Sequence, residues 1–297
     1  MGFLHRLSPN FIRYAIGGLT NRLTRPKKCP DCGNDKSVCI DRKGFHGFYT
    51  CSGCGIGYRY PYETAVEMAA FYQSEYGDSS IATDLPSDAQ VQQLVQHGAL
   101  GTIFDRSWHL RVLSQLGMKK GSRVLDFGTS WGYFTLALQQ AGCEAFGFEI
   151  SEPRASVGAK LGITIFCREM DIPKGLDIVC STHVIEHVPK PMEKLREMLS
   201  WVKPGGMVIA YTPNGGVGAQ RKHPSGFHHS WGRVHPVLLS ANCIVKAFAH
   251  EPLLLTSDDS PENLARWDGR SRMIDACEGE GLLIVIKRPE LAPNEPA

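Results

Sequence analysis

Apolar and basic positions alternate along the first 26 residues. In "MGFLHRLSPNFIRYAIGGLTNRL", apolar side chains at positions 4, 7, 11, 15 and 19 alternate with Arg6, Arg13 and Arg22. This spacing predicts a basic amphipathic helix over residues 1–26, broken near Pro9 and again near residues 17–18, where two glycines follow one another. Two interpretations stay open: a helix packed on its own domain, and a peripheral contact with a membrane or a protein partner.

Residues 27–62 hold two short strand-like runs within "SVCIDRKGFHGFYT", one on each side of Gly44. They predict a small hairpin. Beyond it, "YRYPYETAVEMAAFYQSEYG" predicts a turn and then a helix with Val66, Ala69 and Ala70 on one side. The polar, turn-rich "GDSSIATDLPSD" predicts a linker, so we treat residues 63–89 as a helix and linker.

From residue 90 the pattern becomes an alternation of helices and strands. "AQVQQLVQHGALGTIFDRSWHLRVLSQLG" predicts a helix, and strand-like and helical segments alternate after it as far as the strand "GGMVIAYTP". This order predicts an α/β fold with a doubly wound, Rossmann-like sheet. "PLLLTSDD" and "GLLIVIKRP" add an antiparallel C-terminal hairpin, which makes seven strands. The predicted domain covers residues 90–290, with a tail at 291–297.

Composition and charge are ordinary for a globular protein. The 297 residues are 42% apolar and 21% charged, with a net charge of +2, so nothing demands an extended surface for nucleic acid. No stretch approaches the roughly 18 apolar residues of a membrane span. The N-terminal segment has neither the apolar run nor the cleavage site of a signal peptide.

The ten cysteines fall into two groups. "CPDC" and "CSGC" contribute Cys29, Cys32, Cys51 and Cys54, and two such pairs across a gap of this length are typical of a structural zinc site. We therefore predict that residues 27–62 form a zinc ribbon, whose closed set of four thiolates gives the metal a structural role. The other six cysteines are scattered. As free thiols they point to a cytoplasmic protein.

A glycine-containing loop, "DFGTSWGYFT", follows the first strand of the predicted sheet. Ligands bind such sheets at the carboxyl ends of strands. Asp126 precedes the loop, and an aspartate there suits a cationic ligand better than a pyrophosphate. S-adenosylmethionine (SAM) carries a sulfonium and an ammonium group and no phosphate. Glu149 ends the next strand, 21 residues after Gly128, where a carboxylate can accept hydrogen bonds from both ribose hydroxyls.

The motifs "VLDFGTSWGYF", "GFEIS", "HVIEHV" and "KPGG" resemble, in order and spacing, those of class I SAM-dependent methyltransferases over roughly residues 90–290. The chain looks most like the ubiquinone-type O-methyltransferase branch, with a zinc ribbon added at the N-terminus. The resemblance implies that SAM is bound by the following residues: Asp126, Gly128, Ser130, Gly132, Glu149, Ile150, Asp171 and His183. Ser130 stands where this branch often has glycine. Arg168 stands where it often has an acid near the adenine, and Glu169 or Asp171 can substitute for that acid.

Chemistry is expected where the fourth strand ends, at "HVIEHV", which places His183, Glu186 and His187 at i, i+3 and i+4. By resemblance, "VHPVLLS" aligns with the family's "EHLYLFS", so that His235 matches a recurrent histidine. Either His187 or His235 can act as the base that deprotonates an acceptor hydroxyl, because imidazole titrates near neutrality. The two histidines, although 48 positions apart (235 − 187), are expected to lie together over the methyl group.

A bound metal ion is the alternative to a histidine base at this site. Glu186, His187 and His235 can ligate a divalent ion that binds the acceptor oxygen. The plant enzyme that 2′-O-methylates small-RNA ends is similar, with an E-x-x-E-H run and a later histidine. Here His183 stands in place of its first glutamate.

These patterns predict a SAM-dependent methyltransferase that O-methylates a hydroxyl of a sugar, a glycan precursor or a secondary metabolite. An RNA methyltransferase that uses the ribbon to bind nucleic acid is the second interpretation. A clustered basic surface with exposed aromatic side chains would favour it. A SAM-binding scaffold without turnover is the third.

Overall fold

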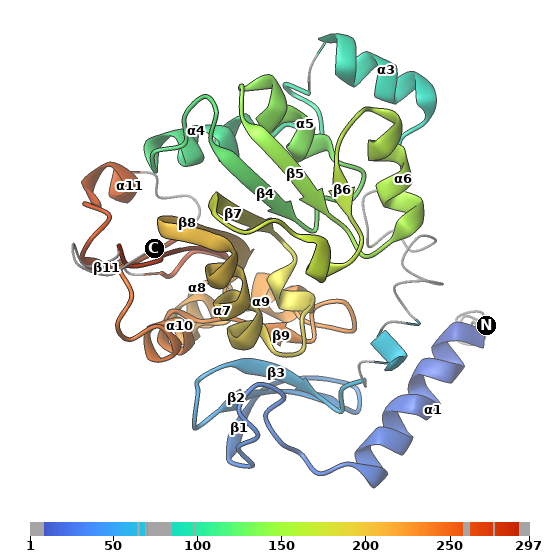
Figure 1. Ribbon diagram of the computed structural model, residues 1–297. Coiled ribbons are helices and arrows are strands. Elements are labelled where there is room, and N and C mark those ends of the chain that lie inside the picture. The colour runs from blue at the N-terminus through green and yellow to red at the C-terminus, as the bar shows by residue number, and fades with distance from the viewer. Residues whose placement is uncertain are drawn as a thin grey trace.

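The computed structural model describes residues 9–63, 66–68, 70, 85–97, 99–257, 262–275 and 277–290. Its main body is an eight-stranded sheet of order β11-β10-β12-β8-β7-β4-β5-β6 (Figure 1). The five strands β6, β5, β4, β7 and β8 are parallel, and β12 runs antiparallel between β8 and β10. The strands are β4 (Arg123–Phe127), β5 (Glu144–Phe148), β6 (Ile165–Phe166), β7 (Leu176–Thr182), β8 (Val202–Pro213), β10 (Leu253–Thr256), β11 (Arg272–Ile274) and β12 (Gly281–Lys287).

Helices cover both faces of this sheet. Side chains alternate along the strands, so Val124 and Ile178 face one core while Leu125 and Val179 face the other. The first core is closed by α4 (Ser107–Gln115), α5 (Tyr133–Gln140) and α11 (Glu262–Arg266), and the second by α7 (Pro191–Trp201) and α10 (Ala241–Ala247). The other helices and 3₁₀ turns are α3 (Asp88–His97), α6 (Glu152–Lys160), η2 (Glu169–Asp171), η3 (Ile185–His187), α8 (Val217–Lys222) and α9 (Pro224–Ser230).

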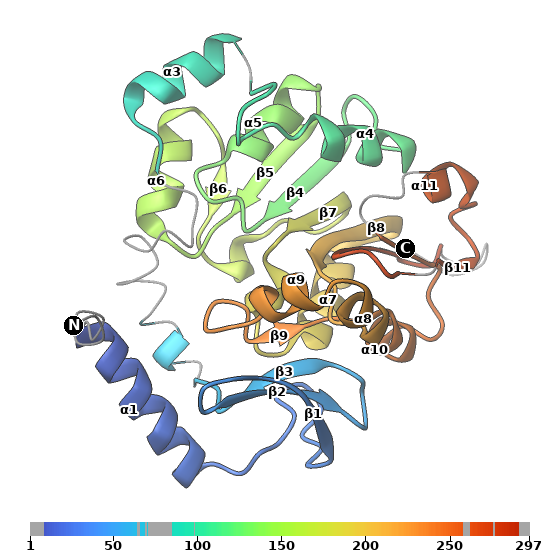
Figure 2. The same cartoon turned by 180° about the vertical axis from the view of Figure 1, so that it is seen from behind.

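A second, four-stranded sheet has the order β1-β2-β3-β9 and lies beneath the main sheet in Figure 1. β1 (Ser37–Lys43), β2 (His46–Cys51) and β3 (Gly57–Tyr60) come from the cysteine-rich segment. β9 (Val237–Leu238) comes from the C-terminal half and pairs antiparallel with β3, joining Gly57 to Leu238 and Tyr58 to Val237. The view from behind shows β9 next to β3, on the side of this sheet that is nearer the main sheet (Figure 2). The ribbon is therefore completed by a strand that lies nearly 180 residues later (237 − 58 = 179).

The N-terminal helix α1 (Pro9–Thr24) lies beside the ribbon (Figure 1). Residues 1–8 of the predicted helix lie outside the described residues, and the predicted break at Gly17 and Gly18 was wrong, because the helix from Pro9 to Thr24 runs through both. At Gly18 an added Cβ would lie only 2.6 Å from the ring of Phe45, so the glycine permits close packing on the ribbon hairpin. Asn21 also donates to the carbonyl of Tyr62. These contacts support packing on the chain's own domain, although three apolar side chains are exposed: Ile16, Leu19 and Leu23.

Two further expectations need correction. The stretch after residue 89 is two helices, α3 and α4, rather than one. Gly101 adopts a φ of 75° between them, and the Asp105 carboxylate accepts from the amides of Gly101 and Ser107. The sheet also has an eighth strand, β11, beside β10. The predicted helix after residue 62 is helical at 66–68 and 70, whereas positions 69 and 71–84, with most of the predicted linker, and the tail at 291–297 lie outside the described residues.

Within the part of the chain that the structure describes, no helix is both long and apolar enough to span a lipid bilayer.

Candidate active site and metal centre

Six of the eight predicted cofactor residues lie where β4 and β5 end, beside the reversal of strand order between β4 and β7, whereas Asp171 lies in η2 and His183 follows β7. Gly128 and Gly132 adopt φ values of 84° and 93°, in the left-handed region that glycine tolerates. Ser130 adopts a φ of 55° and keeps the turn that glycine would make. Its hydroxyl accepts from Arg154 at 2.8 Å. Serine therefore preserves the loop, and Arg154, which the sequence analysis missed, holds it in place.

Glu149 lies directly after β5 and faces this loop. Its carboxylate accepts from the amide of Ser130 at 3.0 Å and from the amide of Ser151 at 2.8 Å. Burial raises the pKa of Glu149, while these two hydrogen bonds and Arg154 oppose the rise. The carboxylate is thus fixed at the end of β5, where the predicted bonds to ribose hydroxyls would be made.

Asp126 lies near the end of β4, and its carboxyl is buried. It accepts from the hydroxyl of Thr135, in α5, at 3.1 Å. Burial raises the pKa of Asp126 to about 6, against the hydrogen bonds from Thr129 and Thr135. Asp126 therefore ties β4 to the helix that follows the loop. Its direct contact with the cofactor stays a prediction.

The two acids considered for the adenine are both engaged in ion pairs. Asp171 in η2 receives two hydrogen bonds from Arg168, at 2.8 and 3.0 Å. Glu169 pairs with Lys194 of α7 at 2.5 Å. Ile150 is 48% exposed beside Glu149, which leaves its side chain free to cover a bound ligand. The adenine contact of Asp171 stays a prediction.

Glu186 is the buried centre of the predicted catalytic segment. It lies in η3, directly after β7, and is fully inaccessible to solvent. Oε2 accepts from the hydroxyl of Thr212 at 3.1 Å, while Oε1 has no hydrogen-bond partner and lies 3.3 Å from Nδ1 of His183 and 3.9 Å from Nε2 of His235. Burial acts to raise the pKa of Glu186, but the three surrounding histidines outweigh it and hold the pKa below its usual value.

The expected meeting of His187 and His235 is confirmed. Their ring centroids lie 4.7 Å apart in an edge-to-face arrangement. Burial lowers the pKa of His187 to about 4, so its imidazole is neutral at physiological pH and can accept a proton or bind a metal. Nδ1 of His235 donates to the carbonyl of Ser230 at 2.7 Å, because a carbonyl only accepts, and Nε2 lies 3.9 Å from Oε1 of Glu186.

The predicted catalytic segment touches the predicted cofactor loop. A Cβ added to Gly128 would lie 2.2 Å from Cγ2 of Val184, which precedes Ile185 and Glu186. The cluster formed by Glu186, His187 and His235 also satisfies the spacing of a metal site, since one ligand atom from each lies within 4.8 Å of the others. The cluster can therefore serve either of the two roles predicted from the sequence, a histidine base or a metal site.

A cavity of about 440 Å³ adjoins the cluster. His183 lines it, as does Ser230, whose carbonyl holds His235. Phe227, on another wall, packs against Phe48 of the ribbon. The remaining lining residues are Pro213, Asn214, Ala219, His223, Gly226, His229, Glu280 and Gly281. His228, one residue from this lining, instead pairs with Asp41 of the ribbon at 2.8 Å.

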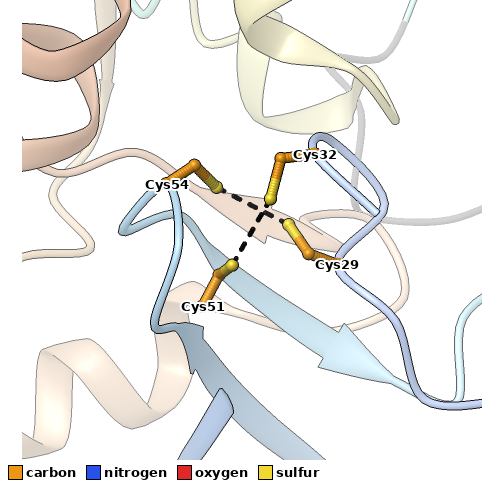
Figure 3. A group of neighbouring side chains, drawn as sticks. All are labelled: Cys29, Cys32, Cys51 and Cys54. Carbon is orange, nitrogen blue, oxygen red and sulfur yellow. Dashed lines mark hydrogen bonds between the residues drawn. The ribbon is translucent and has the colours of Figure 1, made fainter. Parts of the chain in front are cut away.

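The four cysteines of the ribbon converge on one point (Figure 3). Sγ of Cys29 lies 3.6 Å from Sγ of Cys54, and Sγ of Cys32 lies 3.5 Å from Sγ of Cys51. A tetrahedral zinc with bonds of about 2.3 Å would place its sulfurs about 3.8 Å apart, and disulfides would need about 2.05 Å. The hydrogen bond between Cys29 and Cys54 lowers the pKa of Cys54 to about 5 and raises the pKa of Cys29, so Cys54 is the member of this pair that loses its proton first. The donor set fits zinc.

Comparison with known proteins identifies the central part of the chain. A family model described as a methyltransferase domain matches residues 104–242. This range includes the glycine loop, Glu149, the 183–187 segment and His235. It leaves out the cysteine-rich ribbon and the C-terminal strands.

Curated relatives match over shorter stretches. An uncharacterised methyltransferase of Mycobacterium leprae (strain Br4923) is 36% identical over 126 residues, which cover 38% of this chain and 44% of the relative. A ubiquinone biosynthesis O-methyltransferase of Bordetella avium is 31% identical over 109 residues, covering 33% and 45%. The chain thus spans less than half the length of these relatives. Among solved structures, a magnesium protoporphyrin IX methyltransferase from Synechocystis PCC 6803 with bound SAH is 14% identical, with a TM-score of 0.49 over 76% of this chain and all of the other.

Proposed function

We propose that the protein is a class I methyltransferase that transfers a methyl group from SAM to a hydroxyl of a small-molecule or glycan acceptor, since residues 104–242 match a methyltransferase domain. One observation supports this most. Two histidines from distant segments meet beside a buried carboxylate, Val184 of the same segment contacts the glycine loop, and a cavity lies next to this cluster. This is where a class I sheet would bring cofactor and acceptor together.

The proposed reaction is an in-line displacement. When bound, SAM supplies the methyl group: the bond from sulfur to the methyl carbon breaks, the bond from the acceptor oxygen to that carbon forms, and SAH leaves. The hydroxyl proton passes to an imidazole. His187 is neutral at physiological pH, and His235 presents Nε2 toward Glu186, so either can receive it. Glu186 would stabilise the resulting imidazolium, since its Oε1 has no hydrogen-bond partner.

The same carboxylate oxygen supports a metal as the alternative. A buried carboxylate oxygen with two nearby imidazoles offers one oxygen and two nitrogens to a divalent ion. Such an ion would lower the pKa of the acceptor hydroxyl. Chelation separates the two mechanisms, because only the metal mechanism loses turnover when a chelator strips the site while the ribbon zinc is retained.

For the acceptor, we favour a sugar, a glycan precursor or a secondary metabolite that fits the cavity of about 440 Å³. An RNA acceptor is the second candidate, favoured by one observation: residues 22–43 carry seven basic side chains (Arg22, Arg25, Lys27, Lys28, Lys36, Arg42, Lys43) against three acidic ones (Asp31, Asp35, Asp41). Contact between a membrane and the exposed apolar side chains of α1 stays a prediction.

The test is SAH release from SAM with panels of sugars, small phenols and alcohols, and short RNAs. Release with the small hydroxyl compounds and not with RNA is the expected result. We expect His187→Ala to lower turnover by roughly 10²–10⁴-fold while SAM affinity stays nearly unchanged. Tight SAM binding without release on any acceptor would instead support the non-catalytic scaffold.

A further inference from the structure

The "CPDC" turn of the ribbon is bonded to the segment that follows His187. Oδ1 of Asp31, which lies between Cys29 and Cys32, accepts from the backbone amide of Met192 at 3.2 Å. Met192 lies in the first turn of α7, five residues after His187 (192 − 187). First-turn amides have no partner within their own helix, and Lys190, the N-cap of α7, supplies no side-chain bond. The ribbon thus caps the helix that follows one catalytic histidine.

The "CSGC" turn is bonded to the segment that follows His235. The hydroxyl of Ser240, five residues later (240 − 235), donates to the carbonyl of Gly55 at 3.2 Å. Between these points β3 pairs with β9, and the amide of Arg59 donates to the carbonyl of Pro236 at 2.8 Å. The backbone directly after His235 is therefore part of the ribbon sheet.

The loop before His235 is held by the ribbon hairpin. Oδ2 of Asp41, in β1, accepts from Nε1 of Trp231 at 2.7 Å and pairs with His228 at 2.8 Å. Trp231 is buried against Phe48 of β2. Its neighbour Ser230 supplies the carbonyl that fixes Nδ1 of His235. Through Trp231, Asp41 therefore fixes the position of the Ser230 carbonyl, which in turn orients the imidazole of His235.

The cofactor loop is held differently. The amide of Gly128 donates to the carbonyl of Phe148, the amide of Ser130 donates to Glu149, and Arg154 donates to Ser130. These bonds all run within residues 126–154. A change in the ribbon should therefore displace the two histidines more than it displaces the residues predicted to bind SAM.

We propose that the ribbon is the element that positions His187 and His235 against each other. Asp31 acts on the segment of His187, and Asp41 acts on the loop of His235. Zinc in the four-cysteine site would keep the two turns at a fixed separation. This inference rests on the proposed function, since it takes the two histidines as the groups that serve the acceptor. Asp31 and Asp41 are positioning residues, because they act through the backbone and through Trp231.

Three variants of the full-length, zinc-loaded protein test the proposal. Asp31→Ala removes the acceptor from Met192, Asp31→Asn retains an acceptor oxygen, and Asp35→Ala is a matched control, since Asp35 is exposed on the same turn-rich segment. A displacement of a catalytic group by about 1 Å can lower the reaction rate by up to roughly 10²-fold. We expect Asp31→Ala to lower kcat on the order of 10-fold, Asp31→Asn to restore it to within about twofold, and Asp35→Ala to leave it unchanged.

Two readouts separate positioning from a loss of fold. Calorimetry should give SAH affinities within about twofold of each other for all three variants, since the cofactor loop is held separately. The imidazole NMR resonances of His187 and His235, assigned from His187→Gln and His235→Gln spectra, should shift in Asp31→Ala and not in Asp35→Ala. Asp41→Ala, compared with the same control, provides a second variant should Asp31→Ala fail to fold, and it should shift His235 most.

Unshifted imidazole resonances in both Asp31→Ala and Asp41→Ala would overturn the inference, whatever the reaction proves to be. Parallel losses of SAH affinity and turnover would overturn it too, because they indicate general destabilisation. If His187→Ala turned over at the wild-type rate, the proposed role of His187 would fail, whereas the NMR comparison would still decide whether the ribbon positions these side chains.

Discussion

The proposed cofactor half of the site draws its loop and Glu149 from residues 126–154, one strand–loop–helix–strand unit and the start of the helix after it. The proposed acceptor half joins His187 to His235, 48 positions apart (235 − 187), and both segments are bonded to a ribbon that begins near residue 27. A local unit can form its geometry without distant contacts. The acceptor half depends on the order in which three remote segments pack.

This contrast explains what a change in each half should do. Changes in the cofactor half should act mainly on SAM affinity, whereas changes in the ribbon should act mainly on turnover. The two halves touch where the backbone of Gly128 meets the side chain of Val184. A change at that contact should therefore act on both.

Loss of the ribbon metal should give the largest difference between the effect on turnover and the effect on SAM binding. We expect one zinc per chain. Cys32→Ser, or removal of zinc, should unfold the ribbon locally, because metal binding and folding are coupled in such modules. Turnover should then fall by roughly 10²-fold or more, through the displaced histidines, while SAH binding persists. Elemental analysis, SAH calorimetry and turnover on the same sample test this, and a zinc-free protein of unchanged stability and rate would contradict it.

Gly128→Ala should damage both halves together. The new Cβ would lie 2.2 Å from Cγ2 of Val184, and alanine would have to adopt a φ near 84°. Overpacking and the left-handed backbone together cost roughly 2–4 kcal/mol. SAH affinity and turnover should both fall, and adding Val184→Ala should recover the part of the loss that is due to the clash. A double variant no better than Gly128→Ala would show that the backbone angle alone is responsible.

Glu149→Ala should weaken SAM binding by on the order of 1.5–3 kcal/mol, because charge-assisted bonds to the ribose are lost. Turnover at saturating SAM should change much less, since Glu149 lies in the cofactor half. Calorimetry with SAH measures the first effect and initial rates measure the second. A variant with normal affinity would exclude Glu149 from the ribose site.

Ser130→Gly should have the smallest effect. Glycine relieves a left-handed φ of 55°, worth about 1 kcal/mol, but it also removes the hydroxyl that accepts from Arg154, worth about 1.5–3 kcal/mol. SAH affinity should therefore change by no more than roughly 1–2 kcal/mol, in the direction of weaker binding. A large gain in affinity would show that serine strains the loop more than Arg154 supports it.

The sequence was sufficient to predict those parts of the molecule that short, continuous sequence patterns specify. The alternation of helices and strands predicted the sheet, and the motifs predicted the methyltransferase domain; the sheet order and the family match confirm both. The cofactor contacts of the loop residues stay predictions. The prediction of one helix after residue 89 was wrong, because the apolar spacing continues through the turn at Gly101 and does not mark it. The roles of Asp126 and Glu149 at the cofactor stay predictions.

The long-range parts could not be predicted in the same way. β9 is two residues long and owes its conformation to pairing with β3, so no periodicity marks it. Asp31 and Asp41 are ordinary turn and strand residues in sequence, and only the packing of the ribbon brings them to Met192 and Trp231. The meeting of His187 and His235 could be predicted, since both were expected at the same edge of the sheet.

The central claim is that His187 and His235 act as one unit at the acceptor. Turnover should be measured, as SAH release at saturating SAM, for the wild type, His187→Ala, His235→Ala and the double variant. Groups that act together give strongly non-additive losses. The account predicts that the double variant is no slower than the more damaged single variant, with SAH affinity unchanged in all four proteins. Losses that multiply, or a double variant with wild-type turnover, would contradict it.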